Sequence, residues 1–327
     1  MTLFGTTSRR RLLAFALSVW TASIAGAAAA APDDPKILML LWRGATVAED
    51  GFLDGLRDAG LKPDLRMVDI GQDKKILVDF LRATAIAPFD LVYTFGTTTA
   101  MMARPFIKDA RPHIFNAVSD PIAAGLVDDL DDPRNNVSGV AYHAVKSTTD
   151  LLALAQTMAP VTHLGVLFHP LEKQSAQAYF EARSYLARNG GTTTPFRIGA
   201  AMSTLPRVVD QLQSDAGKYS AIYIPSDSYI ISHSRLVFDA LAEIDVPVLG
   251  AHETFVQNGA VLGFNVDYYK AGLHAAEAAR RALQNGSAAG IPVRKLTPRL
   301  VGNAAAAARF GLSLPPDVAL VANPTTH

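Results

Sequence analysis

Residues 91–100 read LVYTFGTTTA, an apolar run that ends in a glycine and three threonines. A run that is apolar along most of its length is typical of a strand covered on both faces of a sheet. A helical pattern follows over residues 98–110, so this stretch predicts a strand, a tight turn and a helix. Repetition of such a unit produces a parallel sheet with helices on both faces. The stretch therefore predicts an α/β fold.

The same alternation continues on both sides of this stretch. The first part of the chain predicts strands over 37–41, 65–70, 91–94 and 113–117, with helices over 49–59, 73–85 and 98–110. A second series predicts strands over 163–168, 193–198, 221–224 and 246–249, with helices over 172–188, 205–214 and 229–243. A strand over 261–266, a helix over 269–283 and a last strand run over 296–303 follow. Two such series predict two doubly wound lobes of parallel sheet.

The first 31 residues are typical of a cleavable export signal. Arg9, Arg10 and Arg11 precede an apolar stretch and a run of five alanines, the small residues that a signal peptidase needs. The order Ser-Arg-Arg-x-Leu-Leu also fits a twin-arginine signal, so the general secretory and twin-arginine routes both stay open. An uncleaved membrane anchor is the alternative, and the Ser, Thr, Gly and Ala content favours cleavage over it. We expect a free periplasmic protein.

Composition excludes several classes of function. The chain has no cysteine, which excludes disulfides, thiolate catalysis and a lipid-modified N-terminus. Its formal net charge is zero, about −3 once the signal is removed, and no basic stripe indicates a nucleic-acid partner. The eight histidines show no metal-ligand spacing and no dinucleotide or phosphate fingerprint occurs, so no metal or cofactor is expected. Ser119 has no base at hand, so no catalytic residue is predicted and the chain is not expected to be an enzyme.

Several motifs occur in a fixed order along the chain: YTFGTTTA at 93–100, IFNAVSDPIAAGLV at 114–127 with NNVSGV at 135–140, LGVLFHPLEKQS at 164–175 and ETFVQNGAVLGFNVDYYKAG at 253–272. Together they resemble the ABC-transporter substrate-binding proteins of the tryptophan/tyrosine type, which have the type I periplasmic-binding fold. The chain departs from that family at residues 133–139, PRNNVSG, where both glycines of the family's Pro-Gly-Gly-Asn-Val-Thr-Gly run are replaced.

The resemblance implies two lobes joined by three crossing segments that close on a small ligand. We expect the crossings near Ala141, Phe264 and Gly290, which gives a first lobe of residues 36–141 plus 264–290 and a second of 142–263 plus 291–327. It also implies a monomeric solute-binding component of an ABC importer, binding a small solute, an amino acid and perhaps an aromatic one, for a permease in the inner membrane. A sensory binding protein that signals to a membrane kinase or chemoreceptor is the alternative.

Polar residues at the predicted strand ends are the candidate ligand contacts. In parallel α/β sheets, ligands bind at the carboxyl ends of the strands. Gly96, Thr97 and Thr98 follow one strand and offer hydroxyls beside the unpaired N–H groups of a helix, which suits a carboxylate or serves only as a helix cap. Ser119 and Asp120 follow the next strand, where Asp120 either contacts the ligand or caps a turn.

Acidic and aromatic residues complete the predicted site. Asp227 opens a helix in the second lobe and either pairs with a ligand ammonium or caps that helix. Glu253 and Glu172 are further candidates for the ammonium, and both also suit the first turn of a helix. The aromatic side chains expected to contact a ring or an apolar group are Trp42, Phe95 and Tyr142.

Overall fold

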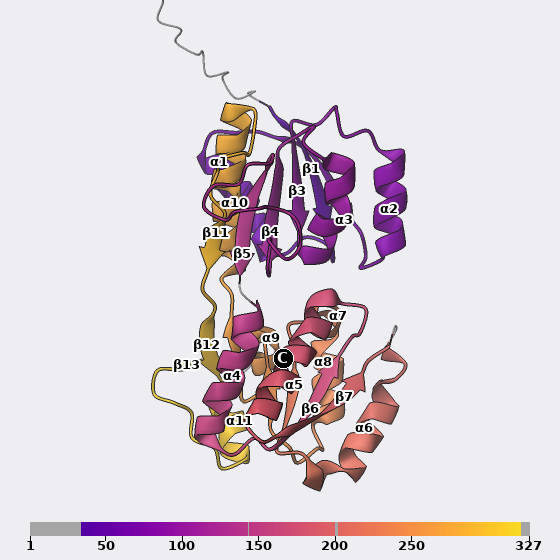
Figure 1. Cartoon of the computed structure of the whole chain (residues 1–327), viewed down its shortest axis with the longest axis vertical. Helices are drawn as coiled ribbons and strands as arrows, with labels where there is room; N and C mark the ends of the chain where they lie inside the picture. Colours follow the sequence, from indigo (N-terminus) through magenta and orange to yellow (C-terminus); the bar gives the residue numbers. More distant parts are fainter. Residues whose placement is uncertain (1–33, 143, 200–201, 322–327) are drawn as a thin grey trace, which may run out of the picture.

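The chain forms two α/β lobes, one above the other along its long axis, in a computed structural model that describes residues 34–142, 144–199 and 202–321 (Figure 1). This arrangement confirms the predicted fold class of two parallel-sheet lobes. The predicted signal peptide lies outside the described residues. Across the described ranges, no helix combines the length and the hydrophobicity needed to cross a bilayer.

The first lobe is built around a sheet of six parallel strands. Its elements are the strands β1 (Lys36–Leu41), β2 (Asp64–Asp69), β3 (Leu91–Phe95), β4 (His113–Val118), β5 (Val137–Tyr142) and β11 (Arg294–Leu296), and the helices α1 (Val47–Asp58), α2 (Lys74–Ala83), α3 (Thr97–Ile107) and α10 (Tyr268–Asn285). The strand order is β11-β5-β4-β3-β1-β2. Helices α1 and α10 pack on one face of this sheet, and α2 and α3 pack on the other. Covering both faces explains why β3 and β4 are buried along their whole length.

The second lobe repeats the plan with a sheet of seven strands. Its strands are β6 (His163–Phe168), β7 (Thr192–Arg197), β8 (Ala221–Ile224), β9 (Val248–Gly250), β10 (Leu262–Asn265), β12 (Arg299–Gly302) and β13 (Ala319–Leu320). Its helices are α4 (Ala144–Met158), α5 (Lys173–Arg188), α6 (Leu205–Ser214), α7 (Ser228–Ser232), α8 (Ser234–Leu241), α9 (Glu253–Gln257) and α11 (Ala304–Arg309), with a 3₁₀ turn at Ala216–Lys218. The order is β13-β12-β10-β9-β8-β6-β7, with β12 antiparallel to β10. Helices α4, α5 and α11 pack on one face, opposite α6 and α8.

Local structure differs from the sequence prediction in several places. The strands β5 and β13 and the helix α11 were not predicted, and β11 and β12 divide the last expected strand run. The helix expected over 229–243 is interrupted at His233, whose ring hydrogen-bonds to the carbonyl of Tyr229, so α7 and α8 are separate. Helix α4 was not predicted, because its residues follow the turn-rich segment where the two lobes were expected to join. Helix α9 was not predicted either, since its five residues are too few for a periodic pattern.

The chain crosses between the lobes three times. The crossings lie between β5 and α4, between β10 and α10, and between β11 and β12. The first two are within a few residues of the positions expected near Ala141 and Phe264. The third is later than expected, because β11 pairs with β5 beyond Gly290 and so still belongs to the first lobe. The segment 291–296 was therefore placed in the wrong lobe.

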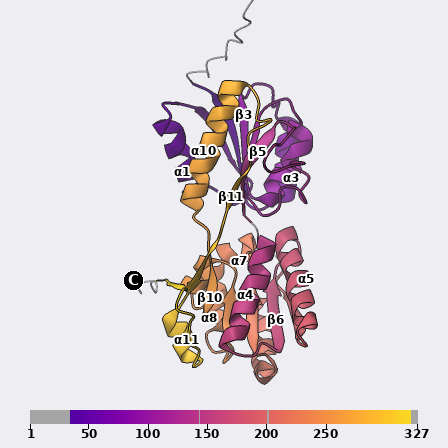
Figure 2. The same ribbon diagram turned by 60° about the vertical axis from the view of Figure 1, so that its left-hand side comes forward.

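Glycines fix α10 against α1, and this contact brings the chain back into the first lobe. The two helices lie side by side in both views (Figures 1 and 2). A Cβ atom on Gly51 would lie 2.1 Å from the carbonyl oxygen of Tyr269, and one on Gly272 would lie 2.1 Å from that of Ala48. Only glycine permits this approach. This contact between α1 and α10 holds the start of α10, including Tyr268, beside the cleft between the lobes.

Candidate ligand-binding site

The predicted contacts of the first lobe follow neighbouring strands of its sheet. Trp42 follows β1, Gly96 follows β3, Ser119 follows β4 and Tyr142 ends β5, and these four strands are adjacent in the sheet. All four are parallel, so their carboxyl ends lie on one edge, which faces the second lobe. The structure therefore brings these predicted residues to one rim of the interlobe cleft.

Gly96 and Thr97 form a polar corner on this rim. Gly96 has φ +85° and ψ +155°, a conformation that strains any residue with a side chain, and it caps α3 without a side-chain hydrogen bond. Thr97 begins α3, and its Oγ1 lies 3.2 Å from Oγ of Ser119 and accepts a hydrogen bond from the Ser119 N–H. Thr98 is the next residue and is half-buried. The corner thus combines two hydroxyls with an uncapped helix N-terminus, which suits an anionic group.

A β-bulge precedes Ser119. The pairing of β4 with β5 shifts register between Phe115 and Val118, and Ala117 has φ +56°. Opposite it, a Cβ atom on Gly139 would lie 2.0 Å from the carbonyl oxygen of Phe115. Bulges of this kind redirect the end of a strand and occur near functional sites. Here the bulge sets the position at which Ser119 meets Thr97.

Asp120 lies beside the corner but serves the turn that follows. Its Oδ1 accepts a hydrogen bond of 2.9 Å from the N–H of Ala123, and its carbonyl accepts one from Ala124. This is the capping role that the sequence left open for Asp120.

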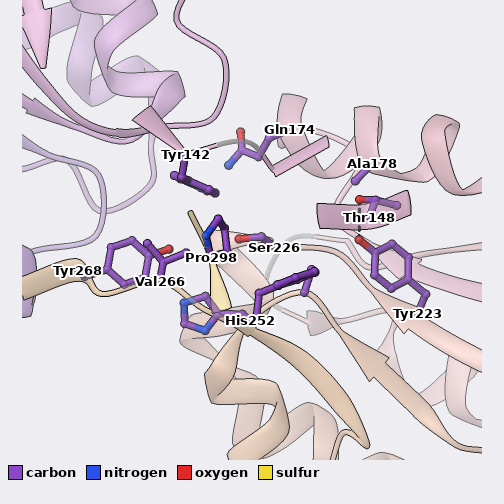
Figure 3. A pocket seen from close by; sticks show the side chains of 12 residues that line it. Tyr142, Thr148, Gln174, Ala178, Tyr223, Ser226, His252, Val266, Tyr268 and Pro298 are labelled. Atoms are coloured by element: carbon purple, nitrogen blue, oxygen red, sulfur yellow. Dashed lines mark hydrogen bonds between the residues drawn. The ribbon is translucent and has the colours of Figure 1, made fainter. Parts of the chain in front are cut away.

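A narrow pocket, with a cavity volume of about 10 Å³, lies between the lobes and continues into the second lobe (Figure 3). Tyr142, Tyr268 and Val266 line it near the crossings, while Ser226, His252 and Gln174 belong to the second lobe. Of the ten residues predicted as ligand contacts, Tyr142 is among those that line this pocket. The remaining lining residues are Thr148, Ala178, Tyr223, Ala251, Phe264 and Pro298.

Contacts between aromatic rings connect the polar corner to the pocket. The rings of Phe95 and Tyr268 have centroids 6.2 Å apart, and those of Tyr268 and His252 are 5.8 Å apart with an interplanar angle of 29°. Burial lowers the pKa of His252 to about 3, so its ring is neutral, and its Nδ1 accepts a hydrogen bond from the N–H of Thr254. Burial raises the pKa of Tyr142, whose hydroxyl interacts with Ser226 and Tyr268. Neutral aromatic groups thus form the mouth of the pocket.

Glu172 is the acidic group that joins the two rims. It is 4% exposed, its Oε1 accepts a hydrogen bond of 3.3 Å from the indole of Trp42, and its Oε2 accepts one of 2.7 Å from Gln174. Burial and the nearby charge of Asp227 raise the pKa of Glu172 to about 7, opposed by Trp42, Lys74 and Arg43. Among the described residues, none of its hydrogen-bond donors carries a charge, so these hydrogen bonds leave the buried carboxylate poorly neutralised.

Asp227 is held by backbone groups. It is fully buried; Oδ1 accepts hydrogen bonds from the N–H groups of Tyr229 and Ile230, and Oδ2 accepts one from that of His169. Burial raises the pKa of Asp227, and these hydrogen bonds oppose that shift. Oδ1 thus caps α7 and Oδ2 is bound by the backbone after β6, which favours the capping alternative over a direct contact with a ligand ammonium.

Glu253 and Arg43 border the cleft. A carboxylate oxygen of Glu253, the first residue of α9, accepts a hydrogen bond from the amide of Asn265 on β10. Arg43, which follows Trp42, lowers the pKa of Tyr142, Glu172 and His252, and its own buried Nε has no hydrogen-bond partner among the described residues. The Nε–H of Arg43 could thus donate a hydrogen bond to an anion.

The two rims touch in this structure. Besides the Trp42 to Glu172 bond, Lys74 donates to the carbonyl of Leu171 at 2.9 Å, and Gln72 donates to the hydroxyl of Ser232 at 3.1 Å. Each of these bonds joins the first lobe to the second. The conformation therefore brings the lobes together over the pocket.

Sequence reasoning predicted Tyr142 alone among the residues that line the pocket, and it ranked Glu172 below Asp227. Tyr268 stands in the pair Tyr268-Tyr269, and nothing local distinguishes it from Tyr269, which is 42% exposed and bonds to Asp54. Gln174 and His252 are polar residues at the openings of helices, a signal that the sequence offered without assigning it. Their role depends on contacts between distant segments.

Comparisons with known proteins agree with this architecture. The family model for the ABC transporter substrate binding protein matches residues 43–326. A curated protein from Clostridioides difficile (strain R20291), the tyrosine-binding protein, is 30% identical over 264 residues, covering 76% of this chain and 72% of that protein.

Two solved structures share the fold. An ABC domain from Streptococcus pneumoniae in complex with L-Trp superposes with a TM-score of 0.75 at 23% identity, covering 88% of this chain and 100% of that one. The ligand-free, open structure of a substrate binding protein with adhesive properties from Clostridium difficile gives a TM-score of 0.64 at 25% identity, covering 88% and 99%. With the family model spanning both lobes and the crossings between them, the chain belongs to the ABC transporter substrate-binding protein family.

Proposed function

We propose that this chain is the exported solute-binding component of an ABC importer and that it takes an aromatic L-amino acid in the interlobe cleft. The observation that carries the proposal is the arrangement of groups where the lobes meet: a narrow pocket with neutral aromatic rings at its mouth and the buried carboxylate of Glu172 beside it. Amino-acid ligands of two proteins described above, tyrosine and L-Trp, support the ligand class. The match to a transporter family favours delivery to a permease over sensing.

In this account each lobe binds one end of the amino acid. The ligand carboxylate binds at the corner of Gly96, Thr97 and Ser119, where N–H groups and hydroxyls donate. The ammonium pairs with Glu172, whose hydrogen-bond donors among the described residues, Trp42 and Gln174, are both uncharged. Such a ligand binds the closed form better than the open form, so it shifts the population toward closure. The permease in the inner membrane then distinguishes the closed form from the open form.

A thermal-shift screen of the mature protein against amino acids, purines and small carboxylates tests the ligand class. At a ligand concentration of one hundred times Kd, linkage predicts about 2.7 kcal/mol of added stability. We expect L-tyrosine or L-tryptophan to raise the melting temperature most. A shift confined to another class of compound, with none from any amino acid, would overturn the proposal.

Removing the hydroxyls of the polar corner should weaken ligand binding. A hydrogen bond to a charged group contributes about 1.5–3 kcal/mol, so the double variant Thr97→Ala/Ser119→Ala should bind the amino acid at least about 100-fold more weakly. Calorimetric titration measures the change. Thr157→Ala/Ser214→Ala, which removes two exposed hydroxyls of the second lobe, is the matched control. Equal affinity of the two double variants would show that the ligand carboxylate binds elsewhere.

A further inference from the structure

The pocket has a polar inner end that the binding of an amino-acid head group does not use. Thr148 on α4 and Tyr223 on β8 line the pocket, with their hydroxyl oxygens 2.8 Å apart. They are 1% and 0% exposed. Figure 3 shows this pair on the opposite side of the pocket from Tyr142 and Tyr268. The pocket thus runs from the interlobe mouth to a hydroxyl pair inside the second lobe.

The wall between these two ends is apolar. Ala178 of α5, Ala251 after β9 and Phe264 of β10 line it. The two alanines add little bulk to this wall, and Phe264 presents a flat surface. Ring surfaces pack well against such walls. The pocket therefore has an aromatic mouth, an apolar middle and a polar inner end.

The hydroxyl pair has hydrogen-bonding capacity left over. Each hydroxyl has one donor hydrogen and two acceptor lone pairs, and their mutual bond uses one hydrogen and one lone pair. One donor hydrogen and several lone pairs stay available. Burial raises the pKa of Tyr223, so its phenol is neutral and keeps its hydrogen. A phenol that enters the pocket can consequently donate to the pair and accept from it.

We infer that Thr148 and Tyr223 determine specificity: they recognise a hydroxyl group on the ligand's ring and select L-tyrosine over L-phenylalanine. The inference rests on the proposed function, because it requires the amino-acid head group at the interlobe mouth and the ring in the apolar middle. Phenylalanine in the same pose would place an apolar ring edge against the pair. The remaining hydrogen-bonding groups of the two hydroxyls would then have no partner on the ligand. Sites built to hydrogen-bond a substrate hydroxyl reject the analogue that lacks it strongly.

Titration of the mature protein with both amino acids tests the inference. The parent protein should bind L-tyrosine at least about tenfold more tightly than L-phenylalanine, the minimum for one well-made hydrogen bond to a buried polar pair. In Thr148→Val/Tyr223→Phe, which removes both hydroxyls with little change of shape, the ratio should fall to about one. Thr148→Ser, with Tyr223 unchanged, keeps both hydroxyls and should retain the preference.

The outcomes separate the inference from the proposed function. A ratio near one in the parent protein, or an unchanged preference in the double variant, overturns the role of the pair while leaving amino-acid binding in place. Failure of the parent protein to bind either amino acid overturns the proposed function itself. The thermal melt of each ligand-free variant shows whether it is folded. Should the double variant not fold, Tyr223→Phe alone must still lower the ratio.

Discussion

At pH 8 the ligand-free Glu172→Gln variant should melt at a higher temperature than the parent protein, yet bind L-tyrosine at least about 30-fold more weakly. Loss of one partner of a buried charge pair costs about 2–5 kcal/mol of binding free energy, which sets that minimum. The stability gain arises because glutamine occupies the same space without a buried charge. Binding and stability thus change in opposite directions.

The pH dependence of this variant follows from the pKa of Glu172. Burial raises this pKa from 4.5 to about 7, so between these values the folded chain binds more protons than the unfolded chain. The free energy of unfolding of the parent protein therefore contains a contribution that is lost as the pH rises through this window. Below about pH 5 the carboxyl is neutral in the folded protein, and the two proteins should melt alike.

Ligand affinity should have the opposite pH dependence. An ammonium pairs with the ionised carboxylate, so affinity of the parent protein should fall by up to about tenfold for each pH unit below 7. Glu172→Gln should lack this slope. Glu243→Gln, at an exposed position of the second lobe, is the control and should show the parent's profile. Identical affinity of Glu172→Gln and the parent at pH 8 would exclude Glu172 from the site.

Asp227→Ala should destabilise the protein by about 3 kcal/mol, because it combines the loss of a helix cap with buried backbone N–H groups left unsatisfied. Three such groups, those of His169, Tyr229 and Ile230, lose their acceptor. Chemical denaturation of the ligand-free variant measures the change. Asp239→Ala removes an exposed carboxylate on α8 and should change the free energy of unfolding by less than about 0.5 kcal/mol.

The same variant separates the two roles that the sequence left open for Asp227. A capping residue affects stability first, and ligand affinity falls only as far as the second lobe is disturbed. Full stability together with abolished binding would show instead that Asp227 contacts the ligand directly. For this reason Glu172→Gln is a cleaner probe of the ammonium site than any substitution of Asp227.

Sequence predicted those parts of the site that depend on strand order. Gly96, Thr97 and Ser119 follow neighbouring parallel strands, and the carboxyl ends of such strands share an edge, so their meeting could be expected. The hydroxyl contact between Thr97 and Ser119 agrees with that expectation. Their binding of a ligand stays a prediction.

The rest of the site depends on contacts between segments far apart in the chain. Trp42 and Glu172 are 130 positions apart and meet only when the lobes approach. Thr148 lies on a helix that the sequence pattern did not indicate, and Tyr223 lies in a strand where a buried aromatic residue has an ordinary packing role. Helix capping, acid pairing and ligand contact favour the same residue types, so composition alone could not rank Glu172 above Asp227.

Calorimetric titration with L-tyrosine and two truncated analogues tests most directly whether the interlobe cleft binds an amino acid by both of its charged ends. Tyramine lacks the carboxylate, and 3-(4-hydroxyphenyl)propionate lacks the ammonium. We expect L-tyrosine to bind with one site per chain and each analogue to bind at least about 30-fold more weakly, since each loses one charged partner. Equal affinity of the amino acid and both analogues, or no binding of L-tyrosine, would contradict this account.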